Sequence, residues 1–219
     1  TGGDFTVTGS PSEYTIGGAG YRSGSGEGGL VWIKARTQSN FHYLFDTEAT
    51  SNTSALLLPL TSGASASTTA LTSFNSDGFS LGSNGGVNGT QDMVSWTFRK
   101  APKFFDVVSY TGTGSPTTIS HNLGSEPAMI IVKRTSGSEA GGIAGWWVCY
   151  HRGLSTPESG AVFLNSTDGR NTAGVWNNTA PTSTEFTVNN NYVNYSGDTY
   201  VAYLFAHNDG DGEFGPDAD

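Results

Sequence analysis

The sequence predicts an all-β protein of two tandem antiparallel β-sandwich units, jelly-roll or concanavalin-like in type, related by internal duplication. Three observations predict this class: a composition suited to strands and turns, short alternating apolar segments, and a series of segments that recurs roughly 100 residues later. Glycine accounts for 31 of the 219 residues, whereas Asp, Glu, Lys and Arg together make only 13%. The polar surface must therefore come largely from Ser, Thr, Asn and Gly, which favour turns and strands, so we expect almost no helix.

Each unit is expected to contain roughly seven short strands separated by turns, and those of the first unit can be given by residue. Turn sequences such as SDG at Ser76–Gly78 and STDG at Ser166–Gly169 interrupt the apolar segments. The clearest strand is Val94–Phe98 (VSWTF), where alternation places three apolar side chains on one face and two polar ones on the other, the pattern of a half-buried strand. In chain order, the expected strands are Phe5–Thr8, Tyr14–Ile16, Leu30–Lys34, His42–Asp46, Ala55–Pro59, Phe79–Gly82 and Met93–Arg99.

The duplication is visible as an ordered series of matched segments. LVWIK at Leu30–Lys34 recurs as MIIVK at Met129–Lys133, and each is followed shortly by Arg and then Thr. The series continues in the same order with YLFD and VCYH, ALLL and AVFL, FSL and FTV, and VSWTF and VAYLF. Strand patterning alone could produce one or two such matches, but an ordered series indicates a repeated unit.

The boundary between the units is expected in KAPK, at Lys100–Lys103. Pro102 cannot donate a hydrogen bond to a strand ladder, so it suits a break between strands. The sequence thus predicts a first unit over residues 1–102 and a second over 103–219, which ends in an acidic extension. The short linker predicts two sandwiches stacked end to end with restricted hinge motion.

Charge excludes two classes of partner. The net charge is −9 and the isoelectric point is near 4.7, and Lys and Arg form no cluster larger than a pair. A protein that binds nucleic acid or an anionic membrane needs concentrated positive charge, so we expect neither partner. The longest apolar run, SALLLPL at Ser54–Leu60, is too short to span a bilayer.

The sequence offers no catalytic constellation. A glycosidase needs two carboxyl groups that face each other across the sugar, and the one close pair is Asp46 and Glu48, for which a solvated loop is the favoured interpretation. Cys149 lies in WWVCY and is expected to be a small buried apolar residue, not a nucleophile. We therefore expect no enzyme activity, no catalytic residue and no cofactor.

Metal binding is not expected either. The four histidines, His42, His121, His151 and His207, show neither H-x-x-x-H nor H-x-H spacing. The segment NDGDGE at Asn208–Glu213 resembles a calcium loop, because oxygen ligands alternate with glycines, but it lacks the full EF-hand pattern. A flexible acidic linker is the favoured interpretation, with calcium as the alternative.

Aromatic residues of the second unit give the best candidate binding site. Sugar rings stack on exposed Trp and Tyr faces, and the candidates for ligand binding are Trp146, Trp147 and Trp176. Trp146 and Trp147 are neighbours on one strand, so one ring should face the core and the other the opposite surface. Covering of these rings by a neighbouring unit or subunit is the favoured interpretation, with a sugar site as the alternative.

Four longer stretches resemble a known family. They are FRKAPKFFDVVSYTGTG, ISHNLGSEPAMIIVKRT, LTSFNSDGFSLGS and YVAYLFAHN, and they resemble the repeated unit of virion-associated, tail-fibre-like structural proteins of marine phages, including cyanophages. The resemblance covers nearly the whole chain and implies a structural role in the virion, outside the cell. It supplies no catalytic residues to carry over.

The expected function is a non-enzymatic structural module of a phage virion, as part of a tail fibre, appendage or capsid-associated protein, that acts in assembly and surface attachment. Its partners would be further copies of itself or other virion proteins. One alternative is a receptor module that binds a host-surface glycan. The other is a concanavalin-like enzyme that degrades polysaccharides.

Overall fold

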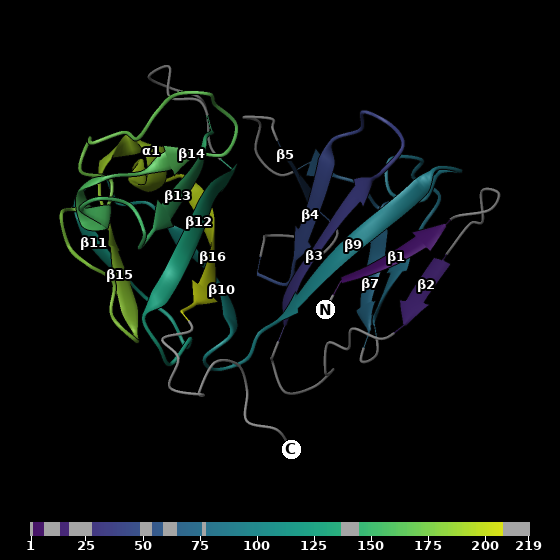
Figure 1. Ribbon diagram of the computed structural model, residues 1–219, viewed down its shortest axis with the longest axis horizontal. Helices are drawn as coiled ribbons and strands as arrows, with labels where there is room; N and C mark the ends of the chain where they lie inside the picture. Colours follow the sequence, from purple (N-terminus) through teal and green to yellow (C-terminus); the bar gives the residue numbers. More distant parts are fainter. Residues whose placement is uncertain are drawn as a thin grey trace. The chain divides into compact units, whose positions relative to one another are not determined.

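The chain is all-β and antiparallel in a computed structural model (Figure 1). Within the described residues, helical structure is limited to α1 (Asn190–Asn194) and a 3₁₀ turn at Pro157–Ser159. The all-β class predicted from composition and alternation is therefore confirmed. The structure describes residues 2–6, 14–17, 28–48, 54–58, 65–75, 78–136 and 145–207.

The chain divides into two compact units, with the division between Arg99 and Lys100. In the first unit a large sheet has the strand order β1-β9-β3-β4-β5-β6, and a smaller sheet has the order β2-β8-β7. The bounds are β1 (Gly2–Thr6), β2 (Tyr14–Gly17), β3 (Gly29–Ala35), β4 (His42–Asp46), β5 (Ser54–Leu58), β6 (Ser65–Ala66), β7 (Leu71–Asn75), β8 (Gly78–Leu81) and β9 (Asp92–Arg99).

The second unit also has one large and one small sheet. The large sheet has the order β10-β16-β12-β13-β14, and the small sheet pairs β11 with β15. The bounds are β10 (Phe105–Thr111), β11 (Thr117–Ser120), β12 (Pro127–Ser136), β13 (Trp147–His151), β14 (Val162–Phe163), β15 (Glu185–Val188) and β16 (Thr199–Ala206).

Each unit has its own hydrophobic core, to which strands of both of its sheets contribute. In the first unit, Val31 and Ile33 of β3 share a buried cluster with Phe79 and Leu81 of β8. In the second unit, the corresponding cluster combines residues of β12 and β16 with Phe186 and others of β11 and β15. Full burial of one such aliphatic or aromatic side chain contributes about 1.5–3 kcal/mol, so these clusters hold the sheets of each unit face to face.

The central strand β9 turns its polar side chains inward. Ser95 and Thr97 are buried on the core side with Met93, whereas Trp96 on the other side is 38% exposed. The register explains this reversal, because Ser95 lies opposite Ile33 and Thr97 opposite Val31. The branched residues of β3 fill the core there, and their small partners on β9 leave them room.

A buried asparagine fixes the loop that follows β10. The Asn194 side chain accepts a hydrogen bond from the Thr113 N–H (2.8 Å) and donates one to the Ser115 carbonyl. The backbone carbonyl of Asn194 accepts the Gly114 N–H at 2.9 Å. Gly114 has a φ of +75°, which glycine adopts readily. A five-residue helix is not stable alone, so these contacts with the loop help to define α1.

We predict that Asn194→Ala lowers the free energy of unfolding by about 1–3 kcal/mol, because it removes the two side-chain hydrogen bonds that join α1 to the loop. Urea denaturation followed by tryptophan fluorescence measures the change. Asn191→Ala is the matched control, since Asn191 is exposed on the same helix and should shift stability by less than about 0.5 kcal/mol. Equal effects of the two substitutions would contradict the assigned role of Asn194.

Candidate functional site

Three rings form an aromatic cluster on the large sheet of the first unit: Trp32, His42 and Trp96. Trp32 and Trp96 are directly opposite each other on β3 and β9, and their ring centroids are 5.9 Å apart at an interplanar angle of 69°. His42 of β4 meets Trp32 edge to face at 5.6 Å. Edge-to-face packing is a favourable geometry for such rings, so each ring helps to orient the next.

A hydrogen bond fixes the protonation pattern of the histidine. The Trp32 indole Nε1–H donates to His42 Nδ1 at 2.9 Å, so the proton of the neutral imidazole lies on Nε2. Burial, and secondarily the positive charge of Lys34, lowers the pKa of His42 from its ordinary value of 6.5. At neutral pH the cluster therefore presents an uncharged N–H donor beside the Trp32 indole.

The cluster retains accessible surface. Trp96 is 38% exposed. The edge strand β1 places Gly2, a residue without a side chain, opposite Trp96. The arrangement can therefore stack a flat apolar surface on Trp96.

The three tryptophans named from the sequence do not form one surface. Trp147 is fully buried, with the Lys133 ammonium 5.7 Å from its ring centroid. Trp176 is also buried and donates from Nε1 to the Gly160 carbonyl at 2.8 Å. Trp146 is half-buried and packs on Phe163 with ring centroids 5.2 Å apart. Of the three, only Trp146 keeps surface that a ligand could reach.

Sequence reasoning missed the aromatic cluster, although a signal for it exists. In LVWIK, alternation places Val31 and Ile33 on one face and Trp32 on the other. If Val31 and Ile33 face the core, Trp32 must face away from it, and Trp96 joins it wherever β9 pairs in register. The contact between Trp32 and Trp96 cannot be predicted from either strand alone, because it depends on the pairing of β3 with β9.

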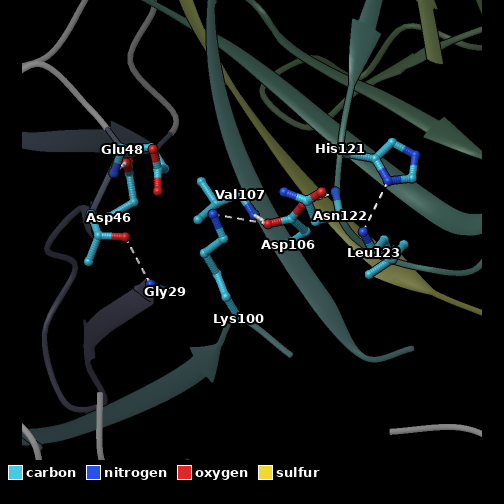
Figure 2. A network of polar contacts seen from close by, with 10 residues as sticks. Gly29, Asp46, Glu48, Lys100, Asp106, Val107, His121, Asn122 and Leu123 are labelled. Atoms are coloured by element: carbon cyan, nitrogen blue, oxygen red, sulfur yellow. Dashed lines mark hydrogen bonds and ion pairs between the residues drawn. The ribbon is translucent and has the colours of Figure 1, made fainter. Parts of the chain in front are cut away.

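A buried polar network lies at the start of the second unit (Figure 2). Asp106 is 2% exposed and accepts hydrogen bonds from the Val107 N–H (2.9 Å) and the Asn122 N–H (2.7 Å). The Lys100 ammonium lies 3.2 Å from the same carboxylate. These bonds tie the loop after β11 to the first residues of β10, which is a structural role.

His121 in the same loop is buried and lacks one partner. Its Nδ1 accepts the Leu123 N–H at 3.2 Å, whereas its buried Nε2 has no hydrogen-bond partner among the described residues. Burial lowers the pKa of His121, and the charges of Asp106 and Glu185 and the Thr182 carbonyl oppose this shift. His121 is thus held as a neutral ring inside the fold.

The close carboxylate pair proves to be a turn. Asp46 is 1% exposed, and its Oδ1 accepts the Glu48 N–H at 2.9 Å. The expectation of a solvated loop is therefore wrong for Asp46, which is a buried group at the end of β4. Its bond across two residues is the short-range pattern that aspartate favours in turns.

Neither the cysteine nor the possible metal ligands form a reactive site in the part of the chain that the structure describes. Cys149 is 3% exposed, as predicted, and burial raises the pKa of its thiol to about 12. Among the described residues, no group of three or more His, Cys, Asp or Glu could hold a metal ion. The calcium candidate at Asn208–Glu213 lies outside those residues. No helix in the described ranges is long and apolar enough to cross a membrane.

The pH dependence of the free energy of unfolding should show the lowered pKa of His121. A lowered pKa in the folded state means that the unfolded chain takes up the proton first as pH falls below about 6.5, so stability is full above that pH and declines below it. We predict that His121→Asn makes this decline between pH 7.5 and 5.5 shallower. Urea denaturation at both pH values measures it, with His42 accounting for a residual slope.

The control is the native chain, measured in the same buffers at both pH values. An unaltered slope in His121→Asn would show that the buried ring does not titrate differently in the folded and unfolded states.

Comparison with known proteins gives a family without an assigned activity. No curated protein and no solved structure matches the chain. A family model described as a domain of unknown function (DUF7483) matches residues 4–216, which is nearly the whole length. The chain therefore belongs to the DUF7483 family.

Proposed function

We propose that this chain is a non-enzymatic structural module of a phage virion, built from two copies of one β-sandwich unit and acting in assembly and surface attachment. The sequence resemblance to virion-associated, tail-fibre-like proteins supports a role in the virion. The matching strand order and register of the two units support a module built from two copies of one unit. Other copies of the chain or other virion proteins would be its partners.

The strand order is the first support for duplication. Following the matched segments, β9, β3, β4 and β5 correspond to β16, β12, β13 and β14. These strands are neighbours in the same order in the two large sheets, and β1 and β10 occupy the equivalent edge. In the smaller sheets, β8 pairs with β2 as β15 pairs with β11.

Residue register is the stronger support, and it is the observation that carries the two-copy part of the proposal. Trp32 lies opposite Trp96 and Leu44 in the first unit. The residues matched to them in sequence, Ile131, Tyr203 and Cys149, are opposite one another in the same way. The match continues one strand further, where Leu44 pairs with Leu56 and Cys149 with Val162. Segments matched only by sequence thus agree with the ladder across four strands.

A turn before the last strand repeats as well. Asn84 Oδ1 accepts the Gly86 N–H at 2.8 Å, and Asn190 Oδ1 accepts the Tyr192 N–H at 3.0 Å. Four residues after each of these asparagines comes a second, buried asparagine, Asn88 or Asn194. A shared side-chain device at this level of detail is difficult to explain by strand patterning alone.

Repetition of this kind suits assembly. Repeated units carry similar faces, so that contacts made by one unit can be made again by the next copy. The low content of charged residues favours surfaces that meet other protein, because charged side chains are costly to desolvate. A second candidate, attachment to a glycan, is favoured by the exposed aromatic cluster.

The virion assignment is tested on particles. We predict that peptides of this chain are found by mass spectrometry in gradient-purified virus particles from a sample whose DNA carries the coding sequence, and that antibodies against the chain label those particles in electron micrographs. Host cell debris from the same gradient is the control. Detection in debris alone, with unlabelled particles, would overturn the virion assignment.

A further inference from the structure

We propose that the aromatic cluster of Trp32, His42 and Trp96 binds one face of a neutral sugar ring of a glycan. The inference does not rest on the virion assignment, because it concerns the chemistry of the first unit alone. It also differs from the site suggested by sequence, which placed the aromatic contact on the second unit.

The first argument is that Trp96 is exposed and yet held in place. Single exposed apolar side chains are common and need no explanation. Trp96 differs because Trp32 packs against it edge to face at 5.9 Å, and Trp32 is itself anchored by its bond to His42. A ring oriented in advance loses little conformational freedom on binding.

The second argument is a polar group on the same sheet face, where His42 of β4 flanks Trp32 on the side away from Trp96 of β9. Because Nδ1 of His42 accepts the Trp32 N–H, the neutral ring keeps its own N–H on Nε2. No hydrogen bond is seen from this group to any described residue. A ligand that places a hydroxyl there satisfies the N–H donor, whereas a purely apolar ligand would cover it without a partner, at a cost.

The third argument concerns the class of ligand. A pyranose presents an apolar C–H face bounded by hydroxyl groups, which fits the exposed Trp96 face, and a hydroxyl of the same glycan fits the neutral donor of His42 on the other side of Trp32. The Lys34 ammonium already donates hydrogen bonds to the carbonyls of Ala35 and Gln38. These bonds hold it against the backbone, so the indole face and the neutral donor determine the class of ligand. Nucleic acid is disfavoured by the net charge of −9.

The experiment uses the full chain and a printed array of neutral hexose and N-acetylhexosamine oligosaccharides with bacterial surface polysaccharides. We expect binding to a subset of them, confirmed by isothermal titration with the soluble oligosaccharide. Trp96→Ala should weaken that binding roughly tenfold, the order of an aromatic stacking contact with its buried area. Trp96→Phe should restore part of it, and His42→Phe should weaken it because it removes both the Nε2 donor and the acceptor that anchors Trp32.

Trp146→Ala is the matched control, since Trp146 is a partly exposed tryptophan of the second unit. It should leave binding unchanged, and circular dichroism should show all variants folded. The proposal is overturned if no sugar on the array binds, if Trp96→Ala binds as the native chain does, or if Trp146→Ala is the variant that loses binding. It is equally overturned if Trp96→Ala instead abolishes self-association, because a second copy then covers the cluster.

Discussion

The antiparallel pairing of β3 with β9 is the interaction on which the first unit depends. It joins Gly29–Ala35 to Asp92–Arg99, segments far apart in the chain, so its closure costs entropy that only the core can offset. Side chains alternate along each strand, and a shift of one residue would turn every side chain to the other face. The core on one face and the aromatic cluster on the other are therefore fixed together by a single register. The pairing of β12 with β16 has the same place in the second unit.

This shared dependence links stability to the proposed binding. Val31 and Ile33 bury their branched side chains against small partners on β9, and this packing leaves Trp32 and Trp96 on the opposite face. The core thus selects the register, and the register aligns the two indoles. Recognition of a sugar would then require no moving part, in keeping with an attachment module whose rings are ordered before the ligand arrives.

Local sequence patterns predicted the positions of the strands well, but predicted the burial and the partners of individual side chains less well. Leu30–Lys34, His42–Asp46 and Met93–Arg99 match β3, β4 and β9 closely, because alternation is a property of a single strand. The short strands β6 and β7 have no predicted counterpart, since their polar residues resemble a loop until a partner strand is known. Lys133 and Arg134 carry no local sign of burial in the sequence, yet both are buried, and Arg134 forms an ion pair with Asp198 at 3.1 Å. Non-local partners of this kind leave no local pattern, and the aromatic cluster was missed for the same reason.

The register of β3 and β9 can be measured directly by NMR of the full chain at pH 7.5, with long-range ¹H–¹⁵N correlation of the His42 ring and nuclear Overhauser effects among the aromatic rings. The register described here predicts a neutral His42 protonated on Nε2, with contacts from the Trp32 indole to both His42 and Trp96. A ring protonated on Nδ1, together with no contact between the two indoles, would contradict the register and remove the basis for the aromatic site.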